Sequence, residues 1–253
     1  MALSHVTLNF ISMVFLAASL VMLWFVILSG LTTTSPLHQT FFLRADTSGI
    51  MGARPISQWT YFFVCGDGNN DCGSAHPAAG VGSAWSGSPS NAPAELVGGF
   101  GGDTTSSNYW YMWRFGWVFF LIGLFFEVLA FFSAFLACCS RLGSAITGLI
   151  ALAALLFYTI AVSLMTATFV KMRNAFVADD REASLGTYAF GFSWGAWAAL
   201  FISTVLFFMG THAKKRNGPP AATPTGRSWG WGRKKSTRSR KSFDGRRVKE
   251  EYP

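Results

Sequence analysis

Four long apolar segments, separated by polar segments, set the pattern of this chain. Three of them, residues 6–30, 142–170 and 185–210, carry no charged side chain, and the fourth, 115–139, carries only Glu127. Each exceeds the roughly 20 residues that cross a bilayer core about 30 Å thick. Backbone groups inside a bilayer must bond one another, so each segment is predicted to be a helix. The pattern predicts an all-α membrane protein with a four-helix bundle.

The first segment also resembles a secretory signal peptide in its position. Its apolar run is longer than the roughly 7–15 residues of a signal-peptide core, and residues 1–5 contain no Lys or Arg. We interpret it as a span. Cleavage would leave the rest of the topology unchanged.

The polar segments predict how the helices are connected. The loop 31–112 is strand-like up to Cys72: "TFFL" stands near its start, and Trp59, Tyr61 and Phe63 alternate as on one face of a strand. The part from 73 to 108 is rich in Gly, Ser, Ala and Pro, and is expected to be irregular and mobile.

The other connections are shorter. Only Ser140 and Arg141 separate the second and third segments, which predicts an antiparallel hairpin. The last connection holds Phe176 and Val177, so the third helix is expected to project beyond the membrane. A cluster before the second span is predicted to form an aromatic belt at the interface, and consists of Tyr109, Trp110, Tyr111 and Trp113.

Charge predicts the orientation. Residues 212–253 hold thirteen Lys and Arg against three acidic residues, a net charge of +10, whereas residues 1–211 hold seven basic and nine acidic side chains, a net charge of −2. Positive charge favours the cytoplasmic side, so the tail is predicted to be cytoplasmic. With four spans the N-terminus lies on the same side and the loop 31–112 is extracellular. We therefore divide the chain into a membrane domain, 1–211, and a disordered basic tail, 212–253.

Cys65 and Cys72 flank "GDGNND", a segment of residues that favour tight turns. Two strands returning through such a turn would place the cysteines opposite one another, and the extracellular side is oxidising. A zinc site needs about four ligands, and only His76 is close in sequence. A redox pair usually has two intervening residues. A structural disulfide is favoured over metal or redox chemistry, and no cofactor is expected.

These residues resemble a known family. An aromatic strand with Trp59, then Cys65 and Cys72, on a four-span chain with a short inner turn, is similar to the claudin-like superfamily. The segment 185–197, "LGTYAFGFSWGAW", is typical of its fungal branch, the SUR/PalI family. The Gly-Leu-Trp that precedes the first cysteine of claudins is absent, which argues against a paracellular junction. The resemblance implies a claudin-like fold with a small, disulfide-stapled, β-containing extracellular loop.

Glu127 is costly near the middle of a span, by about 2.5 kcal/mol or more, and is a functional candidate by default. A proton relay, a lipid headgroup and helix packing are all conceivable roles. We favour packing through a protonated carboxyl bonded to a neighbour such as Ser163, Thr166 or Ser203.

Two further features lie in the spans. Small residues at Gly191, Gly195 and Ala199 predict close helix packing, within the chain or between protomers of a homo-oligomer. Cys138 and Cys139 end the second span on the cytoplasmic side, where S-acylation and plain apolar packing are both open.

The basic tail predicts binding to anionic lipids such as phosphoinositides, because about 1 kcal/mol is gained per basic residue near the membrane surface. Tethering to a membrane favours lipid over nucleic acid as the partner. The candidate lipid-binding residues are Lys214, Lys215, Arg216, Arg233, Lys234, Lys235, Arg238, Arg240 and Lys241. Phosphorylation at Ser236, Ser239 or Ser242 would weaken this attraction. The alternative is a solvated tail without a specific partner.

No phosphate-binding glycine motif is present, and the acidic residues of the loop 31–112 are dispersed among glycines rather than paired beside a His or a nucleophile. We therefore expect no enzymatic activity. The family resemblance implies a multi-pass protein that organises fungal plasma-membrane microdomains of the eisosome type. It also implies cortical scaffold proteins, sphingolipid or sterol as partners, and effects on cell wall and endocytosis. The alternatives are an accessory component of ambient-pH signalling, like PalI, and a transporter or channel.

Overall fold

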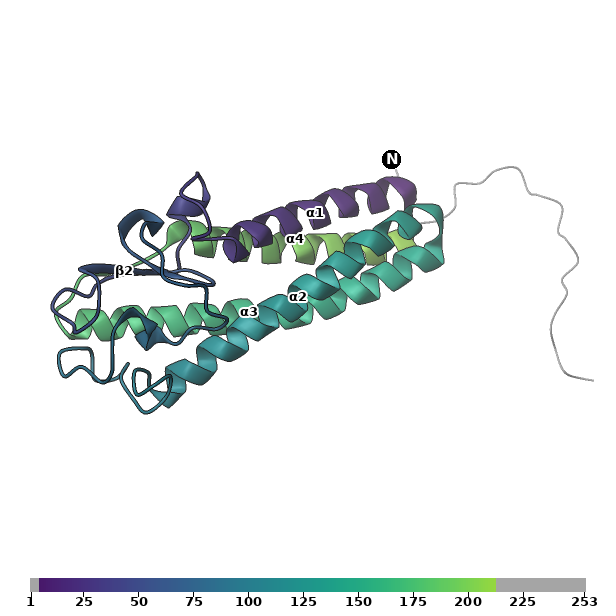
Figure 1. Ribbon diagram of the computed structural model, residues 1–253. Coiled ribbons are helices and arrows are strands. Elements are labelled where there is room, and N and C mark those ends of the chain that lie inside the picture. The colour runs from purple at the N-terminus through teal and green to yellow at the C-terminus, as the bar shows by residue number, and fades with distance from the viewer. Residues whose placement is uncertain (1–4, 213–253) are drawn as a thin grey trace, which may run out of the picture. The chain divides into compact units, whose positions relative to one another are not determined.

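A computed structural model describes residues 5–212, and shows four long helices (Figure 1). Each is long and apolar enough to cross a membrane. The helices are α1 (His5–Ile27), α2 (Ser107–Cys139), α3 (Arg141–Ala178) and α4 (Thr187–His212). The predicted fold class is confirmed: a mostly helical chain carries a small antiparallel sheet and a disulfide.

The helices pack as two neighbouring pairs, α1 beside α4 and α2 beside α3 (Figure 1). The contact between α2 and α3 is close because small residues line it. Gly116 of α2 faces Met165, and Gly123 faces Tyr158. Large apolar side chains on the opposite faces are exposed, among them Phe125, Phe132, Leu142 and Leu149. Such surfaces suit lipid rather than water.

The turn between α2 and α3 is tighter than the predicted pair Ser140 and Arg141. Arg141 already belongs to α3, so Ser140 alone ends one helix and caps the next, accepting a hydrogen bond from the Gly143 backbone N–H at 2.9 Å. A Cβ at Gly143 would overlap the carbonyl oxygen of Leu136. Glycine therefore permits the antiparallel hairpin that the sequence predicts.

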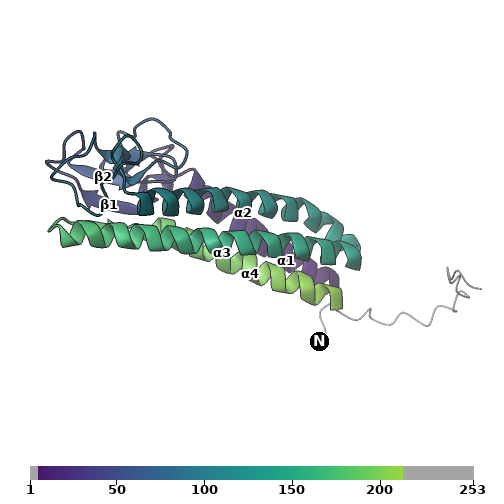
Figure 2. The same ribbon diagram turned by 90° about the horizontal axis from the view of Figure 1, so that it is seen from below.

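Four short strands form one antiparallel sheet in the order β3-β2-β1-β4. Its strands β1 and β2 are labelled in Figure 2. They are β1 (Leu43–Asp46), β2 (Ile56–Trp59), β3 (Val64–Cys65) and β4 (Ala183–Leu185). We call residues 28–106 together with 179–186 the loop domain. The strand β4 comes from the connection between α3 and α4 and was not predicted; it joins both connections into one body. The helix α3 contacts β1 and β4. The expected projection of α3 beyond the membrane stays a prediction.

The predicted alternation along Trp59, Tyr61 and Phe63 is wrong after Trp59, where β2 ends. The Thr60 backbone N–H donates to the Phe63 carbonyl at 2.9 Å, which closes a turn into β3. "TFFL" is also only partly right, since β1 begins at its last residue, Leu43.

The second half of the long loop is irregular, as predicted, with one short helix, η3 (Val81–Ala84). It is nevertheless packed. Trp85 and Leu96 are buried, and the Trp85 indole N–H donates to the Thr104 carbonyl at 3.2 Å. The expected mobility of this part stays a prediction.

Candidate functional site

Cys65 and Cys72 form a disulfide, which confirms the staple predicted from sequence. The intervening turn has positive φ angles at Gly68 (68°), Asn69 (53°) and Asp71 (49°), the region that Gly, Asn and Asp tolerate best. The predicted pair of returning strands is wrong: Cys65 lies in β3, but Cys72 follows the turn outside any strand.

Asn69 fixes this turn to the rest of the loop domain. It is buried, and its backbone N–H donates to Gln58 Oε1 at 2.8 Å. Its side-chain Nδ2 donates to the carbonyls of Leu37 and Thr40, both at 2.9 Å. Three chain segments thus meet at one amide, a role that sequence spacing did not indicate.

Two ion pairs hold the same turn from outside. Arg44 Nε lies 2.8 Å from Asp67 Oδ1, and Arg54 Nε lies 2.9 Å from Asp71 Oδ2. The hydrogen bond from Arg44 lowers the pKa of Asp67. A lowered folded-state pKa contributes stability above the usual carboxyl range, and this is lost as pH falls through the lowered pKa. The sequence showed these acids only as dispersed charges.

Removing the disulfide is expected to loosen the loop domain. In the double variant Cys65→Ser, Cys72→Ser, the free energy of unfolding should fall by about 2–3 kcal/mol, because the unfolded chain regains the freedom of a short closed loop. Thermal unfolding of the detergent-purified protein with and without reductant measures the effect. The reductant should lower the melting temperature of wild type and leave the variant unchanged. No reductant effect on wild type would contradict a stabilising staple.

Trp59 links the sheet to the helices. It is fully buried, and its indole N–H donates to the Val81 carbonyl at 3.0 Å. Its ring lies 5.7 Å from that of Phe176, close to the end of α3 at Ala178. Phe176 is buried, whereas Val177 is exposed. Trp59, identified as a family signature, is here the residue that seats the sheet on α3.

Tyr61 and Gly30 make the corresponding link to the other helices. The Tyr61 hydroxyl donates to the Trp117 carbonyl of α2 at 2.7 Å. Gly30 follows α1 with φ of 79°, and a Cβ there would lie 2.9 Å from Thr60 Oγ1 and 3.3 Å from Cys65 Sγ. The disulfide corner therefore packs directly on the end of the first helix.

The predicted aromatic belt is only partly present. Trp113 is buried, with its ring 5.0 Å from that of Phe169, and Tyr109 is buried as well. Trp110 is half-buried, and Tyr111 is exposed. The reason is that α2 begins at Ser107, eight residues before the predicted Phe115. Successive aromatic residues on a helix point in different directions, so two of the four face the protein.

Glu127 is fully buried, and neither carboxyl oxygen has a hydrogen-bond partner among the described residues. Ser19 of α1 and Tyr158 of α3 lie near its carboxyl.

None of the partners predicted for Glu127 bonds it. The Thr166 hydroxyl donates to the Val162 carbonyl at 2.7 Å, and the Ser203 hydroxyl to the Ser12 carbonyl at 2.9 Å. Ser163 is exposed. Short hydroxyl side chains in helices bond the preceding turn when it is in reach, and this removes Thr166 from the carboxyl.

Sequence reasoning missed a polar stripe on α1. Asn9, Ser12 and Ser19 are all fully buried. Asn9 Nδ2 donates to the Ala137 carbonyl at 2.7 Å, and the Ser19 hydroxyl donates to the Ala196 carbonyl at 2.8 Å. Their spacing of three and seven residues places them on one helix face. That spacing could have revealed the polar stripe from the sequence. It was overlooked because none of the three residues is charged.

The small residues of α4 differ in their surroundings. Gly195 faces Met22 of α1, since a Cβ at Gly195 would lie 3.1 Å from the Met22 sulfur, and Ala199 is buried. Gly191 is exposed, and a Cβ there would meet nothing within 4 Å. Packing of Gly191 against a second protomer stays a prediction.

Several predicted residues lie outside the described part of the structure. The side chains of Cys138 and Cys139 are among them, although α2 extends to Cys139. So are the basic tail residues from Lys214 to Lys241 and the candidate phosphorylation sites Ser236, Ser239 and Ser242.

Comparison with known proteins gives one consistent result. The family model described as SUR7/PalI matches residues 8–206. The chain is 34% identical over 210 residues to Protein SUR7 of Candida albicans, covering 81% of this chain and 75% of the relative. It is 29% identical over 212 residues to Protein SUR7 of Saccharomyces cerevisiae, covering 81% and 67%. It is 27% identical over 218 residues to an uncharacterized plasma membrane protein of S. cerevisiae, covering 82% and 69%.

Proposed function

Because the chain belongs to the SUR7/PalI family, we propose that it organises microdomains of the fungal plasma membrane, of the eisosome type. The family match runs from residue 8 to residue 206, and so includes the loop domain and most of each of the four helices. This is a family of structural membrane proteins rather than of enzymes. A multi-pass plasma-membrane protein follows from the four apolar helices and from the relative named as such.

The packing supports a structural role. Every helix exposes large apolar side chains to its surroundings, and the loop domain is fixed to α1, α2 and α3 through Gly30, Tyr61 and Trp59. Such a body presents a defined surface at one side of the membrane and a defined apolar surface to lipids. Effects on cell wall deposition and endocytosis would follow from organising the cortex.

The tail supplies the second part of the proposal. Its net charge of +10 favours attachment to anionic, phosphoinositide-rich lipid of the cytoplasmic leaflet, with both termini on that side. Cortical scaffold proteins would assemble on the same surface. Attachment at the tail and lateral packing of the helices together would slow diffusion in the membrane.

Fluorescent tagging in a fungal cell tests the proposal. The full chain is expected in static cortical patches that recover slowly after photobleaching. A version ending at Thr211 is expected to reach the membrane but to form less stable patches, because it lacks the basic tail. A diffuse signal from the full chain would contradict the proposal. An endosomal signal would instead favour an accessory role in signalling.

A further inference from the structure

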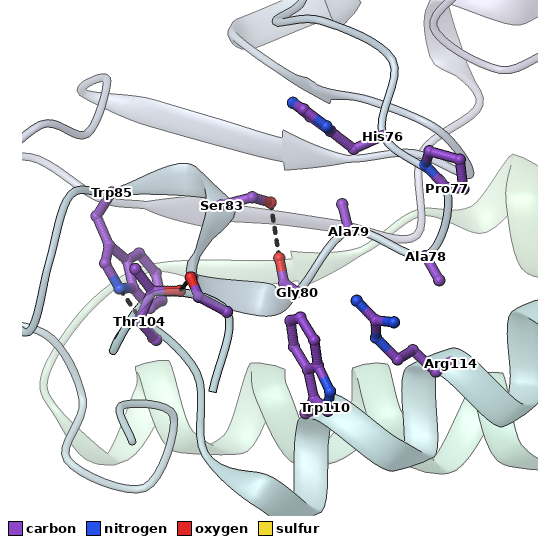
Figure 3. A pocket seen from close by; sticks show the side chains of 12 residues that line it. His76, Pro77, Ala78, Ala79, Gly80, Ser83, Trp85, Thr104, Trp110 and Arg114 are labelled. Atoms are coloured by element: carbon purple, nitrogen blue, oxygen red, sulfur yellow. Dashed lines mark hydrogen bonds between the residues drawn. The ribbon is translucent and has the colours of Figure 1, made fainter. Parts of the chain in front are cut away.

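A pocket of about 310 Å³ lies between the irregular half of the loop domain and the first turns of α2 (Figure 3). Trp110 and Arg114 contribute from α2, and the segment 76–80 contributes from the loop. The volume is at the lower end of the range for ligand sites, which is about 300–1,000 Å³. It suits a small polar group rather than a whole lipid.

Arg114 brings a free positive charge to this pocket. Within residues 5–212 its guanidinium makes no salt bridge or hydrogen bond, and it stacks over the Trp110 ring at 3.7 Å from the centroid. No Asp or Glu is among the described residues that line the pocket. The charge is thus available to a ligand.

Trp110 is held in place. A Cβ at Gly80 would lie 2.9 Å from the Trp110 ring, and a Cβ at Gly101 would lie 2.7 Å from it. The two glycines let the loop backbone close on the indole, and this fixes the platform on which the guanidinium rests. Holding Arg114 in one place before a ligand arrives reduces the entropy lost on binding.

The loop wall adds free donors. Ala78, Ala79 and Gly80 line the pocket, and their backbone N–H groups donate to no acceptor in the described chain. Ala78 and Ala79 are buried. Gly80 is half-buried. Because backbone N–H groups are strong donors, these three can bond an acceptor that enters the pocket. An anion beside Arg114 would satisfy them.

The helix face that carries Arg114 is exposed and otherwise largely apolar. Tyr111, Arg114, Phe115 and Val118 follow the spacing of one helix face and are all exposed. Apolar surface on a membrane span therefore continues directly from the pocket. A ligand with a negative head and acyl chains would fit both surfaces, whereas a soluble anion would use only the first.

We propose that this pocket binds the phosphate group of a phospholipid, with Arg114 and the free amides of residues 78–80 as its donors. The lipid belongs to the leaflet on the loop-domain side, which the charge of the tail predicts to be the outer one. The acyl chains would lie along Tyr111, Phe115 and Val118. The proposal does not depend on the proposed organising function.

Hydrogen–deuterium exchange of the full chain in a phosphate-free maltoside detergent tests it. Dioctanoylphosphatidic acid should slow exchange in residues 76–84, a segment distant in sequence from the basic tail. Dioctanoylglycerol, which lacks the phosphate, should not. In Arg114→Gln the lipid concentration for half-maximal protection should rise about tenfold, the effect of one charged hydrogen bond. Arg114→Lys keeps the positive charge but lacks the planar guanidinium, and it should weaken lipid binding less than Arg114→Gln does.

Arg173→Gln is the matched control, because it removes the same charge from an exposed position on α3 that does not line the pocket. It should bind like wild type. Equal protection in wild type and Arg114→Gln, or equal protection by dioctanoylglycerol, would overturn the proposal. Protection by inorganic phosphate at the same concentration would overturn the lipid as ligand. If Arg114→Gln does not fold, the two lipids compared on wild type decide the question.

Discussion

Gly186→Ala should lower the free energy of unfolding by about 3 kcal/mol or more. Gly186 stands between β4 and α4, and its backbone N–H donates to the Phe42 carbonyl at 3.0 Å. A Cβ at this position would overlap the carbonyl oxygen of Phe41, which belongs to the backbone and cannot rotate away. Either β4 separates from β1 or the start of α4 moves. Thermal unfolding in detergent should show a melting temperature lower by about 6–12 °C.

Gly191→Ala provides the control within the same sequence motif. Nothing lies within 4 Å of a Cβ there, and alanine favours the helix by up to about 1 kcal/mol. Its melting temperature should be unchanged or slightly higher. If both variants lose the same stability, close approach at Gly186 is not the reason that glycine stands there.

Glu127→Lys should destabilise the bundle by about 3 kcal/mol or more, because a charge would be buried without a partner. Glu127→Leu should have the opposite effect. The carboxyl oxygens are buried and unbonded among the described residues, and removing such acceptors should restore about 1–3 kcal/mol. Denaturation of the purified protein in mixed micelles gives the free energies of unfolding directly.

Glu127→Gln separates charge from shape. The amide matches the carboxyl in size and is neutral, so its stability should lie within about 1 kcal/mol of wild type. A loss of stability in Glu127→Leu as large as in Glu127→Lys would show that the carboxyl forms stabilising bonds. The packing role predicted for Glu127 would then be restored.

The helices could be predicted from sequence because an apolar segment of sufficient length has few alternatives in a bilayer. The disulfide could be predicted because Gly68, Asn69 and Asp71 are residues that favour the turn observed. Both features depend on local sequence. The start of α2 could not be predicted from sequence, because its first turns are stabilised by contacts with distant residues, such as that of Trp113 with Phe169.

Features made by distant residues escaped prediction. Ala183–Leu185 has no strand pattern of its own and becomes β4 only by pairing with β1, more than a hundred residues earlier. The partners of Asp67 and the surroundings of Glu127 likewise come from other segments. The same is true of the pocket at Arg114, whose loop wall lies over thirty residues before it in sequence.

The length of α3 sets a height. Its 38 residues extend about 57 Å, whereas the bilayer core is about 30 Å thick. The sheet contacts this helix through β1 and β4, at one end of the four helices (Figure 2). A continuous helix of this length would hold the sheet at a constant distance from the lipid surface.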